Sequence, residues 1–229
     1  MHLLSLWSTS EAVAPNRMTL YQIKPRFQGW LRPFVQLLAD RGVTANQVTT
    51  FAALGSIVVG GLVVALAWLP TIFLLMPLWL FARMALNAID GMLAREHGQQ
   101  SALGAYLNEL GDIVSDLALA IPFVLLFGSV VVPFAVLTVV VECAGLIGPL
   151  AGASRRYDGP LGKSDRALVL GALGLWLGLG FGPGDYGGWI WGLLCLLSIV
   201  TIARRVQRGV QEAHTAQAAG GGQQKPTTE

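Results

Sequence analysis

A polar stretch, residues 87–118, places amide and carboxylate side chains at helical spacing. Asn87 and Asp90 are three residues apart, which puts both on one face of a helix. Farther along, residues spaced by four would stack along one face of the next helix: Gly104, Asn108, Asp112 and Asp116. Because one short connection joins the two helices, their oxygen ligands should meet in a shared pocket.

Oxygen ligands without His or Cys suit a hard cation such as Mg²⁺, Mn²⁺ or Ca²⁺. Gly91 and Gly104 would let a substrate approach the backbone closely, and Arg95 is placed to neutralise a phosphate. This chemistry predicts a metal-dependent phosphate site. The alternative is a structural polar cluster in which these groups pair with Arg83 and Arg95, although such bonds between membrane helices contribute only about 0.6 kcal/mol each.

The helices that must position these groups belong to a membrane protein. Of the 229 residues, 54% are hydrophobic and 12% are charged, whereas soluble domains carry about 25% charged residues. Apolar runs of about 20 residues can cross the hydrocarbon core. We predict an all-α integral membrane fold with six spans, at residues 48–68, 71–89, 104–127, 130–152, 167–182 and 189–202.

The distribution of basic residues predicts the orientation, because cytoplasmic loops collect Lys and Arg. Connections near Pro70, Gly128 and Asp185 contain none. With six spans and both termini in the cytoplasm, every basic residue falls on one side, and the polar pocket opens at the cytoplasmic face. These residues are Arg17, Lys24, Arg26, Arg32, Arg41, Arg83, Arg95, Arg155, Arg156, Lys163, Arg166, Arg204, Arg205, Arg208 and Lys225.

Segments outside the spans have separate predictions. Residues 1–20 are expected to be flexible, and no cleaved signal peptide is apparent. Residues 21–41 mix basic and apolar side chains as an amphipathic helix in the membrane interface does, or as an ordinary cytoplasmic cap helix would. Its two prolines, Pro25 and Pro33, should begin or kink it. The six-helix domain covers residues 42–208, and a disordered tail covers 209–229.

The cysteines, histidines, Glu142 and the glycines of the fifth span give no evidence of a further catalytic or metal site. Cys143 and Cys195 lack CxxC spacing and are expected to be small buried apolar residues, not a disulfide or metal site. Glu142 is an isolated carboxylate within a span, and no function is assigned to it. Glycines in the fifth span should allow close helix packing; they are Gly174, Gly178 and Gly182. No metal-ligand spacing appears among His2, His97 and His214.

The polar stretch resembles the signature of the CDP-alcohol phosphotransferases, D-x2-D-G-x2-A-R-x8-G-x3-D-x3-D. All spacings are preserved at the matching positions, which are Asn87, Asp90, Gly91, Ala94, Arg95, Gly104, Asn108 and Asp112. The segment RGVTANQVT, residues 41–49, is similar to the G-[VI]-T-P-N-x-[VI]-T pattern at the start of the family's first helix, with Ala45 in place of proline. The resemblance covers roughly residues 40–205.

The resemblance implies transfer of a phosphatidyl or phospho-alcohol group from a CDP-linked donor, with CDP-diacylglycerol expected, to a small alcohol, with release of CMP. It assigns Asp112 as the base that deprotonates the acceptor, and Mg²⁺ or Mn²⁺ (one or two ions) as the cofactor. The metal ligands would be Asn87, Asp90, Asn108 and Asp112, with Glu109 and Asp116 as further candidates. The CDP and phosphate groups would contact Gly91, Ala94, Arg95 and Gly104, with Asn46 and Thr49 as further candidates.

Two departures from the signature bear on activity. Asn87 and Asn108 stand where the family has aspartate, so the four motif carboxylates drop to two. Either the site holds fewer or weaker cations, or borrows charge from Glu109 and Asp116, or activity is lost and the chain only binds lipid or nucleotide. The survival of Asp90 and Asp112 favours an active enzyme. A transporter is a weaker reading, because it would need polar groups near the bilayer midplane.

A second basic cluster precedes the fifth predicted span. Arg155, Arg156 and Lys163 are candidates for binding an acceptor phosphate or lipid phosphates. Positive-inside anchoring and contact with anionic lipid explain them equally well. The resemblance further implies a homodimer, and we expect a bacterial cytoplasmic membrane location, phospholipid biosynthesis as the process and no nucleic-acid partner.

Overall fold

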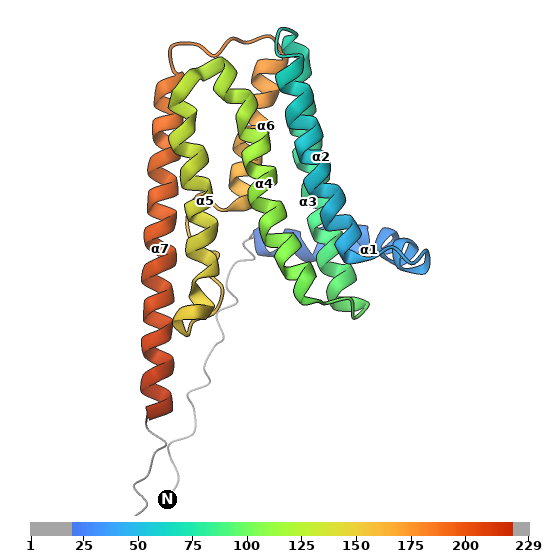
Figure 1. The fold of residues 1–229 in the computed structure, drawn as a ribbon, viewed down its shortest axis with the longest axis vertical. Helices are drawn as coiled ribbons and strands as arrows, with labels where there is room; N and C mark the ends of the chain where they lie inside the picture. The colour runs from blue at the N-terminus through green and yellow to red at the C-terminus, as the bar shows by residue number, and fades with distance from the viewer. Residues whose placement is uncertain (1–19, 222–229) are drawn as a thin grey trace, which may run out of the picture.

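The computed structural model describes residues 20–221, and their side chains from 27 to 218. This part of the chain is entirely helical, without strands (Figure 1). Its elements are α1 (Leu20–Asp40), α2 (Ala45–Ala65), η1 (Pro70–Leu74), α3 (Leu75–Glu96), α4 (Ala102–Phe127), η2 (Gly128–Val131), α5 (Val132–Leu146), η3 (Gly148–Ala151), α6 (Lys163–Gly178) and α7 (Gly187–Gly221).

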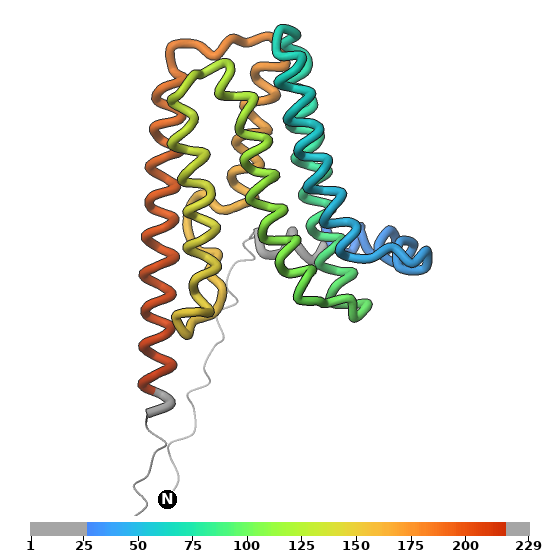
Figure 2. Tube along the Cα trace, viewed as in Figure 1, coloured from blue at the N-terminus to red at the C-terminus, as the bar shows by residue number. Residues whose placement is uncertain are grey.

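Helices α2 to α7 run alongside one another, whereas α1 crosses the bundle beside α3 (Figure 2). Four stretches are long and apolar enough to cross a membrane: Ala45–Ala65, Pro70–Glu96, Ala102–Leu146 and Gly187–Ala218. The third folds back at Gly128, which has a φ of 73° and separates α4 from α5. Helix α6 has 16 residues. The six-span topology and the placement of both termini therefore stay predictions.

The helices that carry the polar stretch begin at capping residues. Thr44 accepts a hydrogen bond from the Gln47 amide, and the Gln47 side chain accepts one from the Thr44 amide, so that both amides at the start of α2 are satisfied. Ser101 accepts from the Gly104 amide at the start of α4. These caps fix where α2 and α4 begin, at the end of the bundle that holds the polar side chains.

Small residues let neighbouring helices approach closely. A Cβ atom added to Gly60 of α2 would lie 2.3 Å from the Ala118 carbonyl oxygen of α4. In α6, the same atom at Gly174 would lie 2.5 Å from the Met76 Cβ, and at Gly178 2.6 Å from a Leu74 methyl. The glycine-packing prediction is confirmed for these two residues. It is wrong for Gly182, which lies beyond α6 and where an added Cβ atom would have nothing within 4 Å.

Aromatic rings fill the end of the bundle where η1 and η2 turn. Trp191 of α7 lies 5.7 Å from Phe123, 5.6 Å from Phe127 and 5.2 Å from Phe134, measured between ring centroids. Phe73 of η1 lies 6.1 Å from Phe123. Offset and edge-on pairs at such distances stabilise packing beyond the area that they bury. The charged side chains described below lie nearer the opposite end.

Two sequence predictions differ from the structure. Helix α7 continues to Gly221 instead of giving way to a disordered tail at residue 209; residues 222–229, like the predicted flexible segment 1–19, lie outside the described residues. Cys143 is exposed on the bundle surface, and Cys195 is half-buried, although neither forms a disulfide. An apolar stretch in a membrane helix faces lipid as readily as the protein interior, so the apolar context did not indicate burial.

Candidate active site

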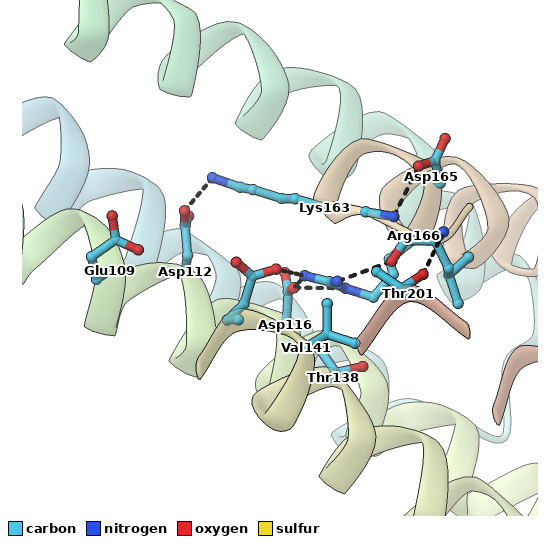
Figure 3. A network of polar contacts seen from close by, with 12 residues as sticks. Glu109, Asp112, Asp116, Thr138, Val141, Lys163, Asp165, Arg166 and Thr201 are labelled. Atoms are coloured by element: carbon cyan, nitrogen blue, oxygen red, sulfur yellow. Dashed lines mark hydrogen bonds and ion pairs between the residues drawn. The ribbon is translucent and has the colours of Figure 1, made fainter. Parts of the chain in front are cut away.

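Asp112 of α4 is held by basic side chains from two other helices. Arg83 of α3 donates to the Asp112 Oδ1 at 3.2 Å and to its main-chain carbonyl at 3.2 Å. The Lys163 ammonium at the start of α6 contacts the other carboxylate oxygen, Oδ2 (Figure 3). Asp112 is 7% exposed. Each oxygen of this carboxylate therefore has a cationic partner, which fixes the orientation of the side chain.

One turn farther along α4, Asp116 joins α3 and α6. Its Oδ1 accepts from Arg83 at 2.6 Å, and its Oδ2 accepts from Arg166 at 2.7 Å. Arg166 also donates to Glu142 of α5 at 2.6 Å, and Arg205 of α7 lies 3.7 Å from the other Glu142 oxygen. This chain of buried charges connects α3, α4, α5, α6 and α7 behind Asp112.

Asp90 of α3 faces the start of α2. Its Oδ2 accepts a hydrogen bond from the Thr49 hydroxyl at 2.8 Å, and both residues are buried. Thr49 also donates to the Ala45 carbonyl, and the Gln99 side chain accepts from the Ala45 amide at 2.7 Å. The first turn of α2 thus carries polar contacts to α3 and to the loop after it.

The two motif glycines lie beneath polar side chains. A Cβ atom at Gly91 would lie 3.1 Å from a guanidinium nitrogen of Arg95, so this exposed arginine lies over the glycine. At Gly104 it would lie 2.6 Å from the Asn46 side-chain oxygen. Both glycines therefore leave room that a side chain would take. The structure brings Asn46 to Gly104 and Thr49 to Asp90.

A cavity of about 120 Å³ lies between α3 and α6. Asn87 lines it together with Lys163, Arg83 and Ser164. The first motif position and the lysine that contacts Asp112 therefore face one space. Asn108 of α4 is half-buried and lies 3.5 Å from the Glu109 carboxylate.

The second basic cluster divides into two groups. Arg155 forms a bidentate ion pair with Glu109, one nitrogen at 2.7 Å, and lies 4.9 Å from the Tyr157 ring centroid. Lys163 contacts Asp112. Arg156 instead contacts Asp158 at 2.7 Å and Glu212 near the end of α7. Two of the three predicted acceptor residues therefore contact α4 carboxylates, and the third does not.

The Arg156 group fastens residues 152–162 to α7. Glu212 accepts from the Ser154 amide and hydroxyl, each at 2.9 Å, and Arg208 donates to Asp158 at 2.9 Å. Burial acts to raise the pKa of Asp158, but the hydrogen bond and charge of Arg156 and the charge of Arg208 outweigh it and lower the pKa below its ordinary value. The helical continuation of α7 thus positions the segment that precedes α6.

The donor set limits the metal that this site would hold. Within residues 27–218, no three His, Cys, Asp or Glu side chains gather as a metal cluster. Glu109 and Asp116 pair with Arg155, Arg83 and Arg166, and Asp112 pairs with Arg83 and Lys163, so a cation bound by any of them would compete with a basic side chain. The motif itself offers Asp90, Asp112 and the amide oxygens of Asn87 and Asn108. Such a set fits a hard cation held by one or two carboxylates and completed by substrate phosphates.

Sequence reasoning named Arg95, Arg155 and Lys163 as candidate site residues, but it missed the buried ion pairs behind Asp112. Arg83 was considered only as a structural partner, and Arg166, Glu142 and Arg205 had no assigned contacts. One available signal was that a carboxylate or guanidinium within a membrane helix needs a partner. Which residue is the partner could be seen only in the fold, because Arg166 lies 24 residues from Glu142 and 50 residues from Asp116 in sequence.

The family model described as CDP-alcohol phosphatidyltransferase matches residues 42–203. Inner membrane protein YnbA of Escherichia coli (strain K12) is 52% identical over 161 residues, which cover 69% of this chain and 80% of that protein. The apolar helices and this relative together identify an integral membrane protein.

Two crystal structures share the fold. Mycobacterium tuberculosis phosphatidylinositol phosphate synthase (PgsA1) with manganese and citrate gives a TM-score of 0.62 at 21% identity, covering 77% of this chain and 87% of the other. The same synthase with CDP-DAG bound gives a TM-score of 0.63 at 20% identity, covering 77% of this chain and 92% of the other. At these identities the likeness shows the fold alone.

Proposed function

Because the chain belongs to the CDP-alcohol phosphatidyltransferase family, we propose that it transfers a phosphatidyl group from CDP-diacylglycerol to a small alcohol and releases CMP. The observation that carries this proposal is Asp112, a buried carboxylate at the last motif position, oriented by Arg83 and Lys163. The reaction would serve phospholipid biosynthesis.

Asp112 acts as the base. It accepts the proton of the acceptor hydroxyl, whose oxygen forms a bond to the phosphorus that bears diacylglycerol. The bond from this phosphorus to the bridging oxygen breaks, and CMP leaves with that oxygen. A positioned carboxylate serves this role because proton removal and alignment must coincide. Arg83 supports the alignment, since it binds both the carboxylate and the main chain of Asp112.

Asp90 and Asp112, with the amide oxygens of Asn87 and Asn108, would hold Mg²⁺ or Mn²⁺. The bound cation would neutralise charge on the pyrophosphate of the donor. Thr49 orients Asp90 through its 2.8 Å hydrogen bond. The half-buried Asn46, whose side-chain oxygen packs against Gly104, supports a nucleotide-binding role at the start of α2 and α4.

The donor and acceptor phosphates would contact different basic side chains. Arg95, exposed above Gly91 near Ala94, is placed for the donor phosphates. Arg155 and Lys163 are placed for an anionic acceptor or for lipid phosphates, because both lie against α4. We assign Arg156 to the support of residues 152–162 instead, since its charge is matched by Asp158 and Glu212.

The site would open at the cytoplasmic face of a bacterial membrane crossed by six helices, with α1 in the interface. The distribution of basic residues supports this orientation. Helix α1 presents apolar side chains outward at positions spaced as one helical face, namely Trp30, Phe34 and Leu37, while Val35 packs against α2 and α3. A homodimer remains an expectation from the family.

The test is CMP release by the detergent-purified chain given CDP-diacylglycerol and Mg²⁺ or Mn²⁺. The acceptor panel contains glycerol 3-phosphate, serine, inositol and inositol phosphate. We expect release that depends on one acceptor and is lost in Asp112→Asn, with both proteins equally monodisperse and thermally stable. Release that persists in Asp112→Asn would remove this residue from the role of base.

The two asparagines support a second candidate, a silent protein that binds lipid or nucleotide. Saturable CDP-diacylglycerol binding without CMP release for any acceptor would favour it. The double variant Asn87→Asp plus Asn108→Asp separates the candidates. A silent binder should gain CMP release, whereas an enzyme adapted to asparagine should lose activity or change its metal preference.

A further inference from the structure

The acidic side chains of α4 near the motif are matched by basic side chains of the same protein. Glu109 pairs with Arg155, Asp112 with Lys163 and Arg83, and Asp116 with Arg83 and Arg166. Asp90 differs, because among the described side chains it contacts the neutral Thr49 and forms no ion pair. Ion-pair partners are thus already supplied to the carboxylates of α4, but among the described side chains not to the carboxylate of α3.

Replacing two carboxylates by amides reduces the negative charge that would hold divalent cations. An amide oxygen can still coordinate, but it contributes no net charge to the site. The motif keeps Asp90 and Asp112, and both oxygens of Asp112 contact nitrogen atoms of Arg83 and Lys163. A second cation beside Asp112 would have to displace an ammonium that already balances this carboxylate.

The position of Lys163 is fixed by the fold. Its helix begins with the Gly162 amide donating to Asp165 at 2.9 Å, and one turn later the buried Arg166 binds Asp116. The first contact caps α6, and the second holds its start against α4. The Lys163 side chain extends from there to Asp112 (Figure 3) and lines the same cavity as Asn87. The ammonium therefore lies beside the space that the first motif residue faces.

We propose that the Lys163 ammonium takes the place of a divalent cation beside Asp112, so that the site binds no more than one divalent cation, at Asp90. This inference rests on the site assigned in the proposed function. With the ammonium beside Asp112 and one cation at Asp90, the site would need only these two carboxylates. This would explain why residues 87 and 108 can be amides.

The experiment counts Mn²⁺ ions per chain by equilibrium dialysis of the full-length protein in detergent, with free Mn²⁺ read by electron paramagnetic resonance. Four proteins are compared: the natural sequence, Asn87→Asp plus Asn108→Asp, Lys163→Met, and the triple combination. We expect no more than one ion for the first three and two for the triple variant, in which the carboxylates return and the ammonium is absent.

Two ions in the natural sequence would overturn the inference. So would two ions in the double aspartate variant, because Lys163 would then not exclude the second cation, or a triple variant that binds no more than the natural chain. Arg204→Met, which removes an exposed charge from α7, is the control and should leave the count unchanged. Thermal unfolding establishes that each variant is folded.

CMP release is measured separately on the natural chain. Release together with two bound ions would contradict the inference and leave the proposed function standing. A single bound ion without release for any acceptor would contradict the proposed function and leave the inference standing.

Discussion

At the scale of single residues, the site is dominated by ion pairs in a nearly dry interior. Asp116 and Arg166 are 7% and 2% exposed. Removing one partner of such a pair leaves a charge that water cannot reach, which is more costly than removing both partners. Arg166 has two acidic partners, Asp116 and Glu142, as Arg83 has in Asp112 and Asp116, so the loss of Arg166 should disturb the network strongly.

We therefore expect Arg166→Met to lower the free energy of unfolding by roughly 3 kcal/mol, because two buried carboxylates each lose a cation. Thermal unfolding in detergent, followed by tryptophan fluorescence, measures the change. Arg204→Met is the matched control, because Arg204 is exposed on α7. Equal unfolding temperatures for the two variants would contradict the structural role given to Arg166.

The pair formed by Glu109 and Arg155 predicts an effect on the acceptor. In Glu109→Gln, Arg155 loses its ionic partner and becomes free to bind an anionic acceptor. If the pair is worth about 1 kcal/mol, KM for a phosphate-bearing acceptor should fall about fivefold, with kcat nearly unchanged. KM for a neutral acceptor is the internal control. A fall for both acceptor types would mean that charge is not the cause.

Helical spacing predicted which motif residues share a face, because period and register are properties of neighbouring residues. It could not predict their partners. Lys163 reaches Asp112 across 51 residues of sequence, and Arg155 reaches Glu109 across 46. Such pairings depend on which helices lie side by side, and positive-inside anchoring alone explained the same basic residues before the fold was known.

At the scale of elements, α2 packs against both α3 and α4, the two helices that carry the halves of the motif. Gly60 and Gly61 are adjacent in α2, but only Gly60 faces the Ala118 carbonyl; a Cβ at Gly61 would have nothing within 4 Å. The two glycines are neighbours in the same helix, but Gly60 packs against α4 whereas a Cβ atom at Gly61 would contact no other helix.

Gly60→Val should destabilise the protein by about 2 kcal/mol or more, because the added side chain must push two helix backbones apart. Gly61→Val should change stability by less than about 0.5 kcal/mol, as expected at a surface position. Thermal unfolding measures the difference in stability between the two variants. The helix propensity of valine affects both variants equally and therefore cancels in this difference. A similar loss in both would show that α2 and α4 are not packed through Gly60.

Helix boundaries were predictable only where hydropathy changes. Helix α3 runs to Glu96, past the predicted span end at residue 89, because polar residues continue the helix beyond the apolar run. Helix α7 likewise passes the predicted end at 202 and reaches Gly221. Its Glu212 contacts Ser154 and Arg156, and no local pattern signals this tertiary support.

At the scale of the whole molecule, the topology has a direct test. In a Cys143→Ser, Cys195→Ser background, Gln100→Cys and Asp185→Cys place single thiols at exposed positions in opposite connections. A membrane-impermeant maleimide should label position 185 in intact spheroplasts and position 100 only in everted vesicles, because the proposed orientation places the basic loops in the cytoplasm. Labelling of both positions from one side would contradict six spans.

The aromatic end of the bundle has a consequence for the membrane as an electrical insulator. Rings of Phe73, Phe123 and Trp191 fill the interior between the ion pairs and the end where η1 and η2 turn. A hydrated ion or a proton that enters among the charged side chains would meet this apolar packing and be turned back. An enzyme with the proposed function could therefore bind charged reactants at one leaflet while the bilayer stays impermeable to ions.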